Sequence, residues 1–151
     1  ATTAFPSGIG AIPIEVTENQ CPLYFKRKEY LTDSAGAGEW RGGLSQTIEI
    51  ANREKAPFTI SAATFDRIKY PAKGRDGGGP GVKGVARLGS GKAIPDKGIH
   101  VIPTGDSLVV ELPGGGGFGD ARKRSRALVE ADVKSGVVSL EAAERDYSLD
   151  S

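Results

Sequence analysis

The chain of 151 residues contains no methionine, a single cysteine and a single histidine. A lone cysteine, Cys21, cannot form a disulfide within the chain, so nothing supports an extracellular disulfide scaffold and the cytoplasm is favoured. His100 stands alone as well, which excludes a two-histidine metal site built from this chain only. Because no initiator methionine is present, we expect the chain to be a piece of a longer protein.

Long apolar runs and an excess of charge of either sign are also absent. No stretch approaches the roughly 20 apolar residues that span a bilayer. The first residues, ATTAFPSGIG, lack the basic and apolar regions of a signal peptide. Lysine and arginine together number 20 against 19 aspartate and glutamate residues. The sequence therefore offers no electrostatic basis for binding nucleic acid or an anionic membrane.

Glycine is abundant, with 22 residues, and nine prolines accompany it, which indicates many tight turns. Between the turns lie seven short segments rich in β-branched or aromatic residues, most of them alternating with polar ones, as is typical of half-buried strands. REKAP at 53–57 predicts a hairpin connection, and PTGD at 103–106 predicts a turn. The predicted strands are 11–17, 23–31, 44–52, 58–66, 82–90, 98–103 and 107–113.

Strands at this spacing, with no helical pattern between them, favour an antiparallel β-sandwich or a barrel-like core. The predicted fold class is mainly β, and α+β overall. We expect residues 1–113 to form the antiparallel β core. Residues 114–151 should form a glycine turn and two C-terminal helices packed on the same domain.

The apolar period changes from that of a strand to that of a helix after Pro113. Asp120 is a candidate N-cap of the first helix and Gly136 its C-terminal stop. Ser139 can cap a second helix that runs to about Tyr147. The first helix should turn one stripe toward the core, formed by Leu128, Val129, Asp132 and Val133.

The stretch PGGGGFGDARKR, residues 113–124, could be a phosphate cradle or only a turn. It lacks the lysine and the hydroxyl of a Walker-type loop. The dinucleotide fingerprint fits Gly114, Gly116 and Gly119, but no β-α-β unit with a downstream acidic residue follows. Two interpretations remain open: a structural turn that leads into a helix, and an anion site at the helix N-terminus.

The segment FDRIKYPAKGRDGGGPG, residues 65–81, is the stronger candidate for a binding site. Charged residues, among them Asp66, bracket a loop in which glycines would let the backbone approach a ligand closely. Guanidinium groups suit bidentate recognition of carboxylate or phosphate. The alternative is a long loop tied down by ordinary ion pairs. The candidate substrate- or anion-binding residues are Arg67, Arg75, Asp76, Gly77, Gly78 and Gly79.

Other residues with chemical potential give weaker signals. His100 lies in a predicted strand, as a packed or surface residue or as an acid-base group whose partner is not identified. Cys21 has no identifiable base, so it is not expected to be a nucleophile. Trp40, in the glycine-rich stretch 33–46, is expected to anchor that turn by burial. The sequence identifies no catalytic residue and no metal ligand.

Four stretches together resemble the C-terminal part of the hydantoinase B/oxoprolinase family, which includes N-methylhydantoinase B, 5-oxoprolinase and the alpha-type subunit of acetone carboxylase. The resemblance extends from about residue 5 to residue 147, and the start FPSGIGAIPIEV is similar to a point inside such a subunit. The sequence departs from the family pattern at Ser45, Ala121 and Ser148, which affects turns only. The four stretches are DSAGAGEWRGGLSQ, FDRIKYPAKGRDGGGPG, LPGGGGFGDARKR and VKSGVVSLEAAERDY.

The resemblance implies an ATP-dependent amidohydrolase that opens cyclic amides such as hydantoins or 5-oxoproline. ATP and Mg²⁺ would bind to a hydantoinase A-type partner subunit or domain, and any metal ligands would lie in the part of the subunit outside this chain. The lactam oxygen would be phosphorylated, and water would open the activated ring. The chain by itself is then expected to bind no cofactor and to be inactive.

Two alternatives to this function remain. Related family members carboxylate ketones, so the chain could belong to an ATP-dependent ketone carboxylase. It could also be a non-catalytic scaffold that docks the ATP-binding subunit. If the chain belongs to a cyclic-amide hydrolase, Arg67, Arg75 and the glycines 77–79 are expected to face the phosphorylated intermediate.

Overall fold

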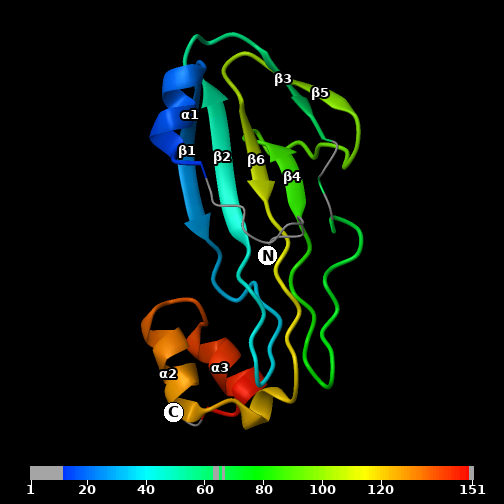
Figure 1. Ribbon diagram of the computed structural model, residues 1–151. Coiled ribbons are helices and arrows are strands. Elements are labelled where there is room, and N and C mark those ends of the chain that lie inside the picture. Colours follow the sequence, from blue (N-terminus) through cyan, green and yellow to red (C-terminus); the bar gives the residue numbers. More distant parts are fainter. Residues whose placement is uncertain (1–11, 63–64, 66, 150–151) are drawn as a thin grey trace.

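The computed structural model describes residues 12–62, 65 and 67–149. Within this part of the chain, six antiparallel strands form two sheets and are accompanied by three α-helices and one 3₁₀ turn (Figure 1). The predicted mainly β, α+β fold class is therefore confirmed. The elements are α1 (Ile14–Gln20), β1 (Leu23–Tyr30), β2 (Gln46–Asn52), β3 (Phe58–Ser61), β4 (Val85–Leu88), β5 (Ile99–Ile102), β6 (Ser107–Glu111), η1 (Ala121–Lys123), α2 (Arg126–Lys134) and α3 (Leu140–Tyr147).

The two sheets pack face to face over a small apolar core. The larger sheet has the strand order β1-β2-β6-β4, and the smaller one pairs β3 with β5. Alternation along β6 sends Leu108 and Val110 toward the small sheet, where they meet the fully buried Ile102 of β5. Phe58 and Ile60 of β3 close the same core. The arrangement is a short sandwich at one end of the molecule.

The first predicted strand is wrong, because residues 14–20 form helix α1. Residue 11 lies outside the described residues. Ile14, Val16 and Thr17 favour a strand locally, but Pro13 takes the N-cap position, where its missing N–H costs no hydrogen bond. Glu18 then holds the helix against the neighbouring residues by accepting hydrogen bonds from the Phe25 backbone N–H and the Arg53 guanidinium. Tertiary contacts thus override the local preference.

The predicted hairpin between the strands now labelled β2 and β3 is also wrong. β2 pairs with β1 and β6, whereas β3 pairs only with β5. The connecting residues do form a tight turn, since the Asn52 side chain accepts from the Glu54 N–H at 2.9 Å and donates to the Ala56 carbonyl at 3.1 Å. This turn carries the chain from one sheet to the other instead of folding it back on its neighbour.

Extended segments connect the sheets to helices α2 and α3, which lie at the opposite end of the molecule from the sheets, whereas α1 lies beside β1 (Figure 1). We call the segments 31–45, 71–84 and 112–120 the stem. Their backbones hydrogen-bond to one another directly, for example Gly36 N–H to the Gly115 carbonyl at 2.8 Å and Gly117 N–H to the Gly79 carbonyl at 2.9 Å. A Cβ atom at Gly117 would lie 2.0 Å from the Ala37 carbonyl oxygen. The interior of the stem is therefore filled by backbone, which only glycine permits.

This packing explains why Trp40 does not anchor the stem by burial, as we had expected. The indole is 64% exposed. The stem interior has no room for a large side chain, because the glycines beside Trp40 already touch neighbouring backbone. A Cβ at Gly38, for example, would lie 2.7 Å from the Phe118 nitrogen. Trp40 can only point outward.

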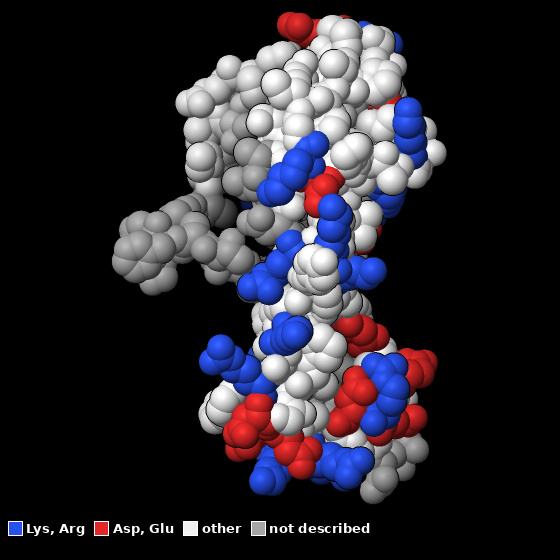
Figure 2. All heavy atoms as spheres, turned by 90° about the vertical axis from the view of Figure 1, so that its right-hand side faces the viewer, with Lys and Arg blue, Asp and Glu red and all other residues white. Residues whose placement is uncertain are grey.

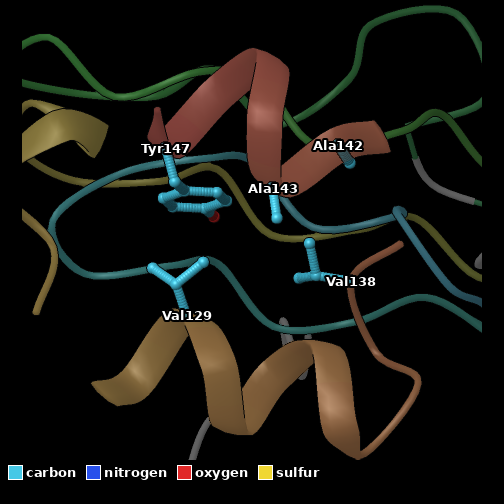
Figure 3. Packing of buried hydrophobic residues seen from close by; sticks show 5 residues of the cluster. All are labelled: Val129, Val138, Ala142, Ala143 and Tyr147. Carbon is cyan, nitrogen blue, oxygen red and sulfur yellow. The ribbon is translucent and has the colours of Figure 1, made fainter. Parts of the chain in front are cut away.

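The far end of the molecule holds a second core between α2 and α3. Val129, Val138, Ala142, Ala143 and Tyr147 are buried there and face one another (Figure 3). Ser139 caps α3 as predicted, with its hydroxyl accepting the Ala142 N–H at 3.1 Å. Among the described residues, none of the helices has the length and apolar character needed to cross a membrane.

The start of the first predicted helix needs correction. Asp120 does cap a turn, accepting the Arg122 N–H at 3.0 Å, but the turn is the short 3₁₀ element η1. Arg124 then becomes extended, and α2 begins only at Arg126. The helix ends before Gly136, which takes the left-handed conformation at φ 74° as predicted.

Candidate functional site

The two arginines predicted as a binding pair line the same hollow on the protein surface. Arg67 and Arg75, both exposed, border an open space of about 570 Å³ beside the stem. Because the described residues of the lining provide guanidinium and ammonium groups and no carboxylate, it suits an anionic ligand. We call this space the basic hollow. The rest of its lining comes from Tyr70, Pro71, Ala72, Lys73 and Gly74.

Backbone hydrogen bonds fix both ends of this segment. Arg67 takes the left-handed conformation at φ 57°, and its carbonyl accepts the Gly84 N–H at 3.1 Å. The Arg75 N–H donates to the Gly117 carbonyl at 3.0 Å, and its carbonyl accepts the Gly119 N–H at 3.1 Å. The starting points of the two side chains are thus held by the rigid stem, while their guanidinium groups reach solvent.

A second hollow, of about 510 Å³, adjoins the first and shares Arg67 and Tyr70 with it. Tyr70 is 81% exposed and lines both spaces. Lys69 lines this second hollow, where its ammonium group lies 3.4 Å from an Asp96 carboxylate oxygen. The carboxylate makes the second hollow less cationic than the first.

Positive charge gathers on this side of the molecule. Figure 2 shows Lys and Arg side chains clustered along the narrow part between the sheet end and the helix end. In the part of the chain that the structure describes, the side chains of Arg67, Lys73 and Arg75 form no ion pair. An anion in the basic hollow would therefore meet cations that do not first have to leave another partner.

The remaining predicted residues form the turn that follows Arg75. Asp76 and Gly77 both have positive φ, 51° and 90°, and the Gly78 N–H donates to the Arg75 carbonyl at 2.9 Å. This is the pattern of a type I′ turn. The Gly79 N–H donates to the Ala37 carbonyl at 2.7 Å. The turn thus closes against the stem beside the basic hollow, without contributing to its lining, and Asp66 lies outside the described residues.

The stretch 113–124 has a structural role, because residues 113–120 belong to the stem and residues 121–123 form η1. The N–H groups of Gly114, Gly115 and Gly117 all donate to backbone carbonyls of neighbouring segments, at 2.8 to 3.0 Å. Those amides are occupied and cannot cradle an anion. Of the two interpretations left open by the sequence, these contacts support the structural turn.

An ion-pair cluster that sequence reasoning missed joins the helices to the stem. Asp132 of α2 accepts from the Arg41 Nε at 3.0 Å and from the Arg124 Nη2 at 2.9 Å. Arg124 also donates to the Glu39 carbonyl at 3.0 Å, and its side chain is only 9% exposed. The sequence did contain one indication of this cluster, because Asp132 belongs to the predicted apolar stripe of the helix. A carboxylate that faces the protein interior needs a cation as its partner.

Tyr147 lies beside this cluster at the end of α3. Burial is the main cause that raises the pKa of its phenol, opposed by the positive charges of Arg124 and Arg41. The tyrosine therefore stays protonated and uncharged around neutral pH. These largely buried residues hold the helical end in place.

The lone histidine and cysteine lie apart from the basic hollow. His100, in β5, has its Nε2 3.1 Å from the Lys97 carbonyl oxygen. Cys21 follows α1 and donates to the Thr17 carbonyl at 3.3 Å. Within residues 12–62, 65 and 67–149, no three His, Cys, Asp or Glu side chains gather in a way that could hold a metal ion.

Comparison with known proteins places the chain in a sequence family. Residues 1–121 match the family model described as hydantoinase B/oxoprolinase. An uncharacterized protein of Methanocaldococcus jannaschii is 35% identical over 140 residues, which cover 91% of this chain and 24% of the relative. The caprolactamase subunit beta of Pseudomonas jessenii is 30% identical over 145 residues, covering 90% of this chain and 24% of that subunit.

Solved structures share the fold. The ATP-dependent caprolactamase of Pseudomonas jessenii superimposes with a TM-score of 0.73 at 26% identity, covering 91% of this chain and 25% of that one. A nucleotide-free acetone carboxylase gives 0.66 at 20% identity, covering 90% and 22%, and this likeness shows the fold alone. The chain thus spans about a quarter of the length of the relatives it matches.

Proposed function

Because the chain belongs to the hydantoinase B/oxoprolinase family, we propose that it is a segment of a larger, ATP-dependent subunit that opens cyclic amides. A relative is named as a caprolactamase subunit beta, and a caprolactam ring is a cyclic amide. A hydantoinase A-type partner would bind ATP and Mg²⁺ and would phosphorylate the amide. Both proteins would act in the cytoplasm.

The observation that carries this proposal is the position of Arg67 and Arg75 on one hollow. A phosphorylated lactam bears a doubly charged phosphoryl group next to the carbon that water attacks. Arginine forks match phosphate oxygens with two parallel hydrogen bonds, and such charge-assisted bonds are about twice as strong as neutral ones. Lys73 adds a third cation to the same lining.

The reaction balances as follows. The lactam oxygen attacks the γ-phosphorus of ATP, the bond from that phosphorus to the bridging oxygen breaks, and ADP leaves. Water adds to the activated ring carbon, and the C–N bond breaks as the nitrogen takes a proton, which leaves an acyl phosphate. A second water releases inorganic phosphate and the free carboxylate. In each step the phosphoryl group stays anionic, so cations in the basic hollow would hold it throughout.

The proposal is tested with the complete subunit that contains this chain, produced together with its ATP-binding partner. ADP release would be measured with caprolactam, a hydantoin or 5-oxoproline, and separately with acetone plus bicarbonate. We expect ADP release to require a cyclic amide and to match ring opening. The partner alone and the 151-residue chain alone are the controls, and both should be inactive.

Two other outcomes would overturn the proposal in different ways. ADP release that requires acetone and bicarbonate would identify a ketone carboxylase. The chain would instead be a scaffold if it binds the partner and if replacing the basic side chains of the basic hollow leaves turnover unchanged.

A further inference from the structure

Two large aromatic side chains stand next to each other on the outside of the stem. Trp40 is 64% exposed and Phe118 is 49% exposed. The two residues form an antiparallel bridge, in which the Trp40 N–H donates to the Phe118 carbonyl at 3.0 Å and the Phe118 N–H donates back at 2.9 Å. Directly paired residues point to the same side of a sheet, so both rings leave the stem in one direction.

Arg75 extends this pair to a row of three. It forms a parallel bridge with Phe118 on the side away from Trp40. Its side chain therefore leaves the stem on the same side as the two rings. We call Trp40, Phe118 and Arg75 the aromatic row. Because Arg75 also lines the basic hollow, the row ends at the edge of the proposed anion site.

The packing of the stem keeps these rings outside. A Cβ at Gly38 would lie 2.7 Å from the nitrogen and from the oxygen of Phe118, so the backbone behind the row leaves no space for a ring. Rings on a rigid backbone lose little conformational freedom when they are covered. Exposed aromatic and arginine side chains in one patch are also the composition that dominates protein interfaces.

We propose that the aromatic row is the surface against which the remaining three quarters of the same subunit pack. This rests on the proposed function, in which the chain is a segment of a larger subunit. The relatives that share this fold carry it in chains about four times as long, since it accounts for only 25% of the caprolactamase chain. The occupant must present an apolar surface to Trp40 and Phe118. When the rest of the subunit packs on the aromatic row, it borders the basic hollow and keeps water away from the bound anion on that side.

Hydroxyl-radical footprinting tests this directly, because aromatic side chains are oxidised at rates that follow their exposure. The rates at Trp40 and Phe118 would be compared between the 151-residue chain and the complete subunit without its ATP-binding partner. We expect both rates to fall several-fold in the complete subunit. Tyr30, which is 68% exposed on β1, is the matched control and should react at the same rate in both.

The alternatives give different results. Unchanged rates at Trp40 and Phe118 in the complete subunit overturn the inference. Protection that begins only when the ATP-binding partner is added also overturns it and assigns the row to the interface between subunits. Tyr147, only 8% exposed, reports whether the short chain is folded. If the 151-residue chain is not folded, the test uses the complete subunit only. There, Trp40 must be oxidised more slowly than Tyr30 after correction for the intrinsic reactivity of the two side chains.

The footprint and the turnover assay can fail separately. If the aromatic row is protected in a complete subunit that opens no cyclic amide, the inferred interface stands and the proposed reaction is overturned. If the subunit opens the ring while Trp40 is still exposed, the proposed reaction stands and the inferred interface is overturned. As a second variant, Phe118→Ala should raise the oxidation of Trp40 in the complete subunit several-fold, whereas Tyr30→Ala should leave it unchanged.

Discussion

The Asp132 carboxylate receives two N–H groups of the Arg41 guanidinium, Nε at 3.0 Å and Nη2 at 3.3 Å, across 91 positions of sequence. The same carboxylate binds Arg124, so one helix residue holds two cations that belong to the stem and to the linker before α2. The sheet end and the helix end are thus connected by a side-chain contact in addition to the backbone of the stem.

Replacing Asp132 with asparagine should weaken this connection. Arg41 and Arg124 would keep little exposure and lose their shared anion, and an unpaired buried charge is costly. We expect the free energy of unfolding to fall by about 2–4 kcal/mol in urea titrations. The control is Glu130→Gln, which removes an exposed charge on the same helix and should cost less than about 0.5 kcal/mol. Equal effects of the two changes would contradict the account of the cluster.

The stem predicts a sharp difference between two glycines that face the same neighbour. A Cβ at Gly117 would lie 2.0 Å from the Ala37 carbonyl oxygen, whereas a Cβ at Gly79 would lie 3.5 Å from the Ala37 nitrogen. Gly117→Ala should cost about 3 kcal/mol or more, because the backbone must move apart. Gly79→Ala should cost about 1 kcal/mol or less. Thermal unfolding of both variants checks the difference, and a tolerated Gly117→Ala would show that the stem is looser than described.

Glu49 gives the fold a pH-dependent contribution. The Ser107 hydroxyl donates to it at 2.7 Å and, together with Lys26 and Arg27, holds the pKa of its carboxyl below the usual 4.5. A lowered pKa stabilises the fold at pH values above 4.5, and that stability is lost as the pH falls through the folded-state pKa. Ser107→Ala should therefore cost roughly 1–3 kcal/mol at neutral pH and clearly less in acid.

The measurement for Ser107 is chemical unfolding at neutral pH and again below the folded-state pKa of Glu49. Glu49→Gln serves as the control, because without the carboxylate the cost of losing the Ser107 hydroxyl should no longer depend on pH. A cost that is the same at both pH values in the otherwise unchanged protein would show that Glu49 does not provide this contribution.

Local patterns were sufficient to predict most of the β end of the fold. Six of the seven predicted strands match strands of the structure, since alternation and β-branched residues act over a few residues. The exception, 11–17, depends on Glu18 reaching Phe25 and Arg53, and such a contact is not visible in a local pattern. Strand pairing was equally out of reach, because the turn after Asn52 could serve either a hairpin or a crossing between sheets.

The sequence indicated the stem only through its glycine content. Backbone packs against backbone there because three segments that are distant in the sequence come together, and no single stretch of sequence predicts this meeting. The segments are 31–45, 71–84 and 112–120. The exposure of Trp40 follows from that meeting, so burial was the wrong expectation. Ser148 was expected to affect only a turn. It takes the left-handed conformation at φ 54°, which glycine adopts most readily.

The candidate site was predictable in composition but not in shape. The loop length and the arginines pointed to Arg67 and Arg75, which line one hollow. The glycines 77–79 carried the same prediction, yet positive φ at Asp76 and Gly77 serves a tight turn. Whether these residues bind an anion stays a prediction.

The most direct measurement is the turnover number of the complete subunit, with its ATP-binding partner and a cyclic amide, when Arg75 is replaced by alanine. Removing a cation that stabilises a phosphoryl group should lower turnover by about tenfold or more. Lys92→Ala, which removes an exposed cation outside the lining of the hollow, should leave turnover unchanged. Wild-type turnover by a normally folded Arg75→Ala subunit would contradict the proposal that the basic hollow holds the activated intermediate.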